Sequence, residues 1–176
     1  NELIEGECFC GTVRYRIAGK LTNARACHCS RCRKAFSGAS SAYAELADPE
    51  SFRWLSGEEN LQHYASQIGW GLAFCKTCGT TLCGTHNGNV HGITLGTVNG
   101  DPGVEVQAHI FVGSKAPWDH IGGSAPQFEE WQKNTQLSFP ADTPQPLLHD
   151  YPLWQGRIEV ECSSELRLIN KFVSYK

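Results

Sequence analysis

Several common features are missing from this sequence. Its 176 residues contain no methionine, not even an initiator, which predicts that the natural chain starts a few residues earlier. No apolar run approaches the roughly 20 residues that a membrane-spanning helix requires. The first residues also lack the charged-then-apolar pattern of a secretory signal. We therefore expect no membrane partner and a cytoplasmic location.

Charged residues are also scarce. They make up 19% of the sequence, and the formal net charge is −3. The basic residues are scattered, apart from one short cluster of Arg31, Arg33 and Lys34 around Cys32. Binding to nucleic acid normally needs an extended basic face, so we expect no nucleic-acid partner. The hydrophobic share of 40% is typical of a folded protein, and the length suits one domain with a sizeable core.

Cysteine, by contrast, is abundant, with nine residues. An odd number, a sufficient length and the missing secretory signal argue against a disulfide framework. Most of the cysteines fall in three tight groups, namely Cys8 and Cys10, then Cys27, Cys29 and Cys32, then Cys75 and Cys78. Such close neighbours seldom bridge each other, whereas a tight turn can aim two sulfurs at one ion. Thiolates select zinc, cuprous copper or iron–sulfur clusters, and the usual iron–sulfur spacing is absent, so the sequence predicts zinc.

Two glycines indicate how the cysteines divide. Gly11 directly follows Cys10, and Gly79 directly follows Cys78. Glycine permits a left-handed turn, which lets backbone N–H groups point at the sulfurs. Two such knuckles would make one closed site of the structural type. The predicted ligands of this site are Cys8, Cys10, Cys75 and Cys78.

The middle group offers only three sulfurs, those of Cys27, Cys29 and Cys32. If it holds an ion, the fourth position is either open to water or substrate, or closed by His28, Cys83 or a distant histidine. The spacing leaves both alternatives open. Ser30 is expected to cap a short helix over residues 31–36, whose N-terminus would favour the thiolate of Cys32. Cys162, and Cys83 if it is no ligand, should be unpaired and buried.

Short alternating segments dominate the rest of the chain. Residues 12–18 alternate apolar with polar side chains, which is typical of a half-buried strand. Similar strands are predicted for residues 41–45, 52–55, 61–65, 71–74, 93–98 and 106–112. Helical patterns are limited to residues 31–36 and a short turn over 127–132. The expected fold is mainly β, a sandwich of short antiparallel strands.

Composition changes after Phe139. Four prolines interrupt the next stretch, at positions 140, 144, 146 and 152. Two strand-like segments follow, over residues 157–161 and 166–173. We predict a zinc-binding domain over residues 1–139 and a C-terminal extension over residues 140–176, to which the sequence assigns no chemistry.

Four segments resemble the signature of a known family. They are residues 6–11 (GECFCG), 27–34 (CHCSRCRK), 74–80 (FCKTCGT) and 109–118 (HIFVGSKAPW). The family is that of the glutathione-dependent formaldehyde-activating enzymes, which include the centromere protein V group. The resemblance implies an Mss4-like zinc-binding β-sandwich with two zinc ions, one held by four cysteines and one open with three. It also implies carbon–sulfur lyase activity, with glutathione as co-substrate.

The expected chemistry is addition of a thiol to formaldehyde or a related small aldehyde through a zinc-bound thiolate. Candidate catalytic residues are His28, Arg31 and His109, the histidines as proton carriers. Candidate ligand-binding residues are Arg33, Lys34 and Trp118. The cations could pair with the carboxylates of a glutathione-like ligand, and the indole could line a pocket. Each has a structural alternative: solvated surface charge, hydrogen-bonded strand histidine or core aromatic.

Two rival interpretations stay open at this point. The domain could be a non-catalytic binding module for a protein partner, with both zinc ions structural. It could also be a different enzyme that joins a thiol to another electrophile in the same pocket. The coordination of the second ion separates the binding module from an enzyme, because only an enzyme of this kind needs an open position.

Overall fold

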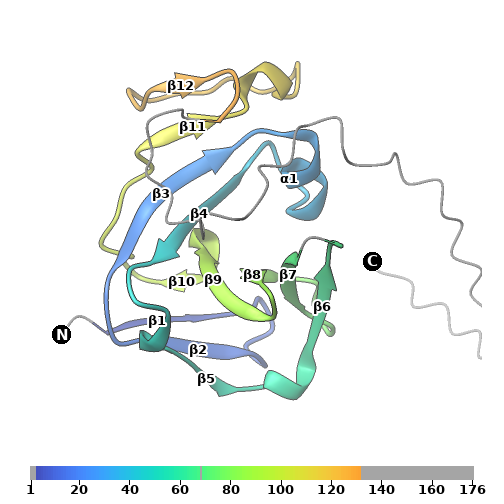
Figure 1. The fold of residues 1–176 in the computed structure, drawn as a ribbon, viewed down its shortest axis with the longest axis vertical. Helices are drawn as coiled ribbons and strands as arrows, with labels where there is room; N and C mark the ends of the chain where they lie inside the picture. The colour runs from blue at the N-terminus through green and yellow to red at the C-terminus, as the bar shows by residue number, and fades with distance from the viewer. Residues whose placement is uncertain (1–2, 68, 132–176) are drawn as a thin grey trace, which may run out of the picture. The chain divides into compact units, whose positions relative to one another are not determined.

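The computed structural model describes residues 3–67 and 69–131, which form two β-sheets and one α-helix (Figure 1). The strands of the first sheet, in spatial order, are β10 (Val98–Asn99), β1 (Ile4–Glu7), β2 (Arg14–Ile17) and β5 (Phe52–Ser56). Those of the second sheet are β12 (Gln127–Phe128), β11 (Ala108–Ile110), β3 (Leu21–Cys27), β4 (Ser41–Leu46), β9 (Asn89–Thr94), β8 (Thr81–His86), β7 (Trp70–Cys75) and β6 (Leu61–Ala65). The mainly β fold class is confirmed.

Short helical segments connect these strands. The α-helix α1 spans Ser30–Ala35 and lies at one end of β3 and β4 (Figure 1). The 3-10 helices are η1 (Pro49–Ser51), η2 (Glu58–Asn60), η3 (Leu95–Thr97) and η4 (Val112–Ser114). No helix of the described residues is long and apolar enough to cross a membrane.

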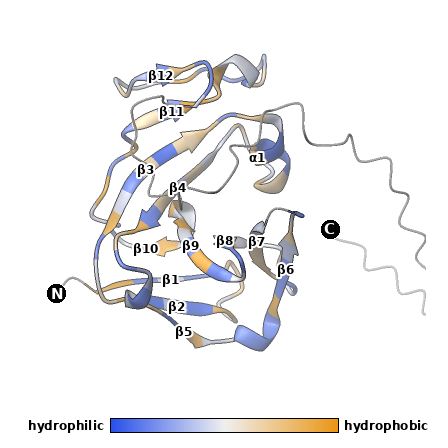
Figure 2. Cartoon of the chain, in the orientation of Figure 1, coloured by the Kyte–Doolittle hydropathy of each residue, from blue (hydrophilic) through white to orange (hydrophobic). Residues whose placement is uncertain are grey.

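The hydrophobic core takes side chains from both sheets. Tyr15 and Ile17 of β2 pack in one buried cluster with Ala44 of β4 and Ile93 of β9. The Tyr15 hydroxyl bonds Thr97 Oγ1 at 2.9 Å, which satisfies the polar end of this buried ring. Hydrophobic and hydrophilic residues are interleaved along the strands (Figure 2), as expected where one face of each sheet is buried.

Most neighbouring strands are antiparallel, as predicted, but the end of the second sheet is not. Strand β11 pairs in parallel with β3, Ile110 opposite Cys27, and also in parallel with β12. A parallel partner needs a long crossover connection, and the chain returns to β3 only after about eighty residues. Local sequence patterns carry no signal for such a return, so the sequence did not predict it.

The predicted strands are present with shifted ends, but some expectations were wrong. Residues 93–98 were predicted as one strand, whereas β9 ends at Thr94 and η3 follows. The turn expected at residues 127–132 begins as strand β12 instead of a helix. Strands β1, β3 and β8 were not predicted. The extension over residues 140–176, with Cys162, lies outside the described residues.

Candidate metal centres and active site

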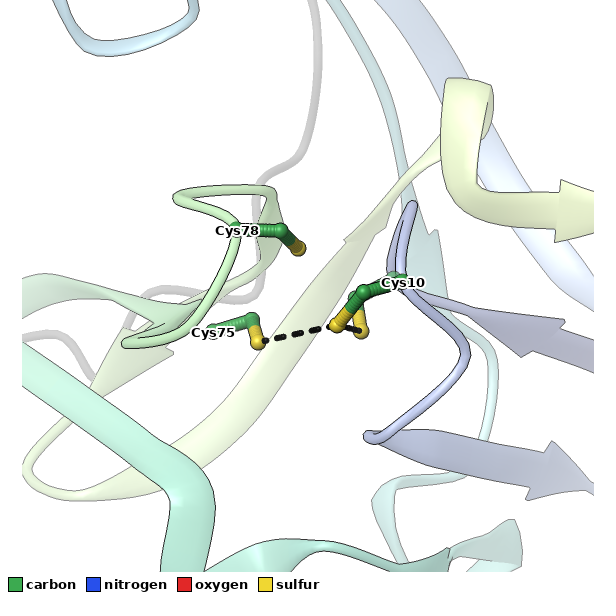
Figure 3. Close-up of side chains that lie close together, drawn as sticks. Cys10, Cys75 and Cys78 are labelled. Carbon is green, nitrogen blue, oxygen red and sulfur yellow. Dashed lines mark hydrogen bonds between the residues drawn. The ribbon is translucent and has the colours of Figure 1, made fainter. Parts of the chain in front are cut away.

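The first cysteine group joins the two sheets. Cys8 and Cys10 lie between β1 and β2, while Cys75 ends β7 and Cys78 lies in the turn that follows. The side chains of Cys10, Cys75 and Cys78 lie close together (Figure 3). Their four sulfurs lie within 4.8 Å of one another. The Sγ of Cys10 is 3.5 Å from that of Cys8 and 3.8 Å from that of Cys75. These four residues could hold a metal ion, in the combination that the sequence predicted.

Both turns are built on glycines in the left-handed conformation. Gly11 has φ +74° and Gly79 has φ +76°, as the sequence predicted. The N–H of Gly11 donates to the carbonyl of Cys8, and that of Gly79 to the carbonyl of Cys75, both at 2.8 Å. An added Cβ would meet nothing within 4 Å at either glycine, so only the backbone conformation selects this residue.

Polar donors surround the sulfurs of this group. The backbone N–H of Val13 lies 3.3 Å from Cys8 Sγ, and the side-chain amide of Asn60 lies 3.2 Å from Cys75 Sγ. Such donors stabilise thiolates, the form in which cysteine binds zinc. The donor set therefore fits a four-thiolate zinc ion of the structural type.

The thiols of this group differ in how readily they ionise. Burial raises the pKa of the Cys8 thiol to about 11. Burial opposes ionisation of Cys78 too, but hydrogen bonds from the Thr80 side chain and backbone lower its pKa to about 6. The thiol of Cys78 is thus ready to bind a cation at neutral pH, whereas that of Cys8 would release its proton to solvent when a metal ion binds.

The second cysteine group lies where β3 meets α1. Cys27 ends β3, Cys29 precedes α1 and Cys32 lies in its first turn. Their sulfurs also lie within 4.8 Å of one another and could hold a metal ion. The helix cap is Cys29, and not Ser30 as predicted: the Cys29 side chain accepts the N–H of Cys32 at 3.4 Å. A sulfur here replaces the oxygen that usually caps a helix.

The thiols of this group have pKa values that are shifted in opposite directions. A hydrogen bond to Cys29 raises the pKa of the Cys27 thiol, and the same contact lowers the pKa of Cys29. Negative charge therefore gathers on Cys29 at the helix N-terminus. Among the residues that the structure describes, no further cysteine, histidine or carboxylate joins this group. Cys83, a possible fourth ligand, is instead buried in the core beside Ala73, and burial raises its pKa to about 12.

The two candidate histidines contact each other. His28 Nε2 lies 3.0 Å from His109 Nδ1, and the Nδ1 of the buried His28 lies 3.4 Å from a carboxylate oxygen of Asp119. Burial lowers the pKa of His28, and the neighbouring His109 lowers it further. The backbone N–H of His28 also donates to the backbone carbonyl of Ile110 at 2.9 Å. These contacts tie the end of β3 to β11 and to the loop after η4.

The basic cluster divides into different environments. Arg33 donates to the backbone carbonyls of His28 and Ser114, at 3.4 and 3.2 Å, and so holds α1 against η4. Arg31 and Lys34 are exposed on the helix, with Arg31 engaged in an interaction of its own. Trp118 is 65% exposed rather than part of the core. The structure thus places Arg33 in a structural contact and leaves the other three on the surface.

Sequence reasoning missed several polar residues near the second cysteine group. Asp119 contacts His28 across 3.4 Å. Ser41 is buried opposite Cys27 and hydrogen-bonds Cys32. Arg25 and Tyr43 lie opposite each other on β3 and β4. Alternation along β3 could have revealed Arg25, but this strand was not predicted; Ser41 and Tyr43 lie on the predicted strand β4, and Asp119 lies in a loop with no local signal.

Comparison with known proteins adds to this geometry. The family described as glutathione-dependent formaldehyde-activating enzyme matches residues 3–114, a span that includes both cysteine groups and His109. The chain belongs to this family. The resemblance seen in the sequence is therefore confirmed, although the matched span ends before Trp118.

Individual relatives are similar over part of their length. An uncharacterized lyase of Schizosaccharomyces pombe is 33% identical over 78 residues, which are 44% of this chain and 54% of that protein. A Halomonas elongata protein named "Putative glutathione-dependent formaldehyde-activating enzyme" is 32% identical over 87 residues, 46% of this chain and 54% of its own. The chain thus spans about half the length of these curated relatives.

A solved structure is similar as well. A Rhodobacter sphaeroides protein, a structural genomics target, shares 30% sequence identity with a TM-score of 0.44. The match covers 58% of this chain and 96% of that one.

Proposed function

We propose that this protein is a zinc-dependent carbon–sulfur lyase that adds glutathione, or another small thiol, to formaldehyde or a related small aldehyde. One observation carries the proposal: the sulfurs of Cys27, Cys29 and Cys32 converge, and no fourth protein ligand joins them among the described residues. Three ligands with one open position are typical of a catalytic zinc site. The family and the names of two relatives support the choice of thiol and aldehyde.

Zinc fits both cysteine groups, because all seven sulfurs are soft ligands in tight clusters. Cys8, Cys10, Cys75 and Cys78 would hold a structural ion. Cys27, Cys29 and Cys32 would hold the second ion and leave one position free. When bound there, zinc lowers the pKa of a thiol at the free position, so that a thiolate forms near neutral pH.

The reaction is balanced without any oxidant or reductant. The thiol gives up its proton, its sulfur forms a bond to the carbonyl carbon, and the C=O π electrons move to the oxygen. That oxygen then takes up one proton, so the product is a hemithioacetal. The reverse reaction, which breaks the carbon–sulfur bond, is the lyase direction. Arg31 and Lys34 are exposed on α1 near Cys32, and they are our candidates for binding the carboxylates of the thiol. The roles of His28 and His109 as proton carriers, and of Arg33 and Trp118 in binding, stay predictions.

The test is to purify the protein without chelator or added thiol, then to measure zinc per chain and the ligands of each ion by X-ray absorption. We expect two zinc ions, one of them with three sulfurs and a light atom that the sulfur of added glutathione replaces. Formation of S-(hydroxymethyl)glutathione should be faster than without protein, as measured by exchange NMR.

Cys29→Ser is the informative variant, because it removes one ligand of the second site only. It should lose one zinc ion and the rate enhancement. Two closed zinc sites that ignore glutathione would contradict the proposal and favour a non-catalytic binding module.

A further inference from the structure

Strands β3 and β4 have two faces of different character. The register places Arg25 opposite Tyr43 and Cys27 opposite Ser41. Because side chains alternate along a strand, these four residues share one face. Ala24 and Ala44 occupy the other face and belong to the hydrophobic core. The second cysteine group is therefore approached from the face that points away from the core.

That outer face is polar, yet much of it is buried. Arg25 is 3% exposed and forms an ion pair with Glu45. Its guanidinium lies over the rings of Tyr43 and Trp131, with its carbon 5.5 and 4.9 Å from their centroids. The Nε and Nη1 of Arg25 make no hydrogen bond to any described residue. Such unsatisfied buried donors are uncommon in proteins, and a site for a polar ligand is one explanation for them.

Tyr43 lies between Arg25 and the cysteine group. It is the diagonal neighbour of Cys27 across the β3–β4 pair, a distance that an aromatic side chain can span. Burial raises the pKa of its phenol; the charge of Arg25 opposes this, while the charges of Cys27 and Cys32 add to it. A tyrosine phenol has an ordinary pKa of about 10 and so carries its proton at neutral pH without any shift. Among the described residues the Tyr43 ring contacts the guanidinium of Arg25, and its hydroxyl makes no hydrogen bond there.

The candidate histidines, His28 and His109, lie on the other face of the sheet from Cys27 and Tyr43. His109 pairs with Ala26, whose side chain alternates with that of Cys27 and therefore points to the opposite face. His28 bonds His109 and so belongs to the same side. The electrostatic contacts of His28 are with His109, Asp119 and Lys115. Among the described residues, Tyr43 is thus the better placed donor on the side of the sheet that carries Cys27.

We propose that Tyr43 is a catalytic residue of this site, and that its hydroxyl donates a hydrogen bond to the aldehyde oxygen while the thiol sulfur adds to the carbon. The proposal rests on the function proposed above. The phenol keeps its own proton throughout, and the proton that the thiol releases balances the one that the new alkoxide takes up. Arg25 is a positioning residue, which holds the Tyr43 ring by stacking. A donor aimed at a developing oxyanion is among the strongest single contributions to catalysis.

The test compares Tyr43→Phe with wild type, since this change removes one oxygen and keeps the ring on Arg25. We expect kcat for glutathione and formaldehyde to fall about 100- to 1,000-fold. The KM for glutathione, its affinity by calorimetry and the zinc content should not change, because no thiol or metal contact is lost. Tyr64→Phe is the matched control, because Tyr64 is 53% exposed on β6. Removal of the Tyr64 hydroxyl should leave kcat unchanged.

The outcomes separate this proposal from the proposed function. If wild type catalyses the addition and Tyr43→Phe keeps its full kcat, the role of Tyr43 is refuted and the function stands. If wild type does not catalyse it, both are refuted. A lower zinc content or weaker glutathione binding in Tyr43→Phe would show a structural role and overturn the proposal. A second measurement needs no folded variant: the ζ-carbon NMR signal of Tyr43 in wild type should shift with the hydroxymethyl product and not with glutathione alone.

Discussion

At the scale of single residues, Arg25 and Glu45 form an ion pair that is buried in the fold. The two side chains are 3% and 11% exposed, and Glu45 also accepts from Asn23 at 2.9 Å. Burial removes both charges from water, so each depends on the other for compensation. On the surface, Arg16 and Glu5 form a chemically identical pair at 2.7 Å, with exposures of 45% and 37%.

We expect Glu45→Gln to lower the free energy of unfolding by about 3 kcal/mol, because the Arg25 charge would stay buried without its partner. Glu5→Gln should cost less than about 1 kcal/mol, because water screens the exposed pair. Urea unfolding of the two zinc-loaded variants and wild type measures both values. Equal losses in the two variants would mean that the Arg25 charge is compensated by something other than Glu45.

At the scale of secondary-structure elements, tight turns fix where the strands end. Gly57 precedes η2 with φ +74°, and a Cβ there would meet the backbone carbonyl of Thr12. Gly79, in the cysteine turn, has nearly the same φ but open space around it. A substitution at Gly79 therefore tests the free-energy cost of the left-handed backbone alone, whereas one at Gly57 adds the cost of a steric clash.

Gly79→Ala should lower stability by about 1 kcal/mol, which is the cost of the left-handed conformation alone. Gly57→Ala should cost about 3 kcal/mol, because the backbone of Thr12 must also move. Chemical denaturation and zinc analysis of each variant test this, and zinc content should stay at the wild-type value in both. A Gly57→Ala variant as stable as Gly79→Ala would show that the turn relaxes freely.

At the scale of the whole molecule, the two cysteine groups connect different parts of the fold. The four-cysteine group connects the β1–β2 turn of one sheet with the β7–β8 turn of the other, 65 residues away between Cys10 and Cys75. The three-cysteine group connects only β3 with the adjacent α1. A metal that cross-links remote elements stabilises the fold more than one that closes a local loop.

Cys10→Ser should therefore lower the melting temperature by more than about 10 °C, since several kcal/mol of metal-linked stability are lost. Cys29→Ser should lower it much less and abolish activity. Differential scanning calorimetry with zinc analysis distinguishes the two variants. Similar melting temperatures for both would show that the four-cysteine ion does not hold the sheets together.

Much of the candidate metal chemistry is readable from the sequence, because it is local. The close spacing of Cys27, Cys29 and Cys32, and the glycines after Cys10 and Cys78, act within one turn of the chain. Local spacing limits where the sulfurs within each cluster can point. That the two clusters of Cys10 and Cys75, 65 residues apart, meet in one group is shown by the tertiary structure. The family resemblance rests on the same short segments. The mainly β class rests on the alternation of apolar and polar residues along the strands.

Which residues face the second cysteine group depends, by contrast, on tertiary packing. The parallel pairing of β11 with β3 brings His109 to His28, and the β3–β4 register sets Tyr43 diagonally across from Cys27. The same packing brings Arg33 to the backbone carbonyls of His28 and Ser114. The physical reason is that a strand has two faces, and which one a residue occupies depends on partners that are distant in the sequence. Spacing determined what could bind a metal; strand pairing determined what surrounds it.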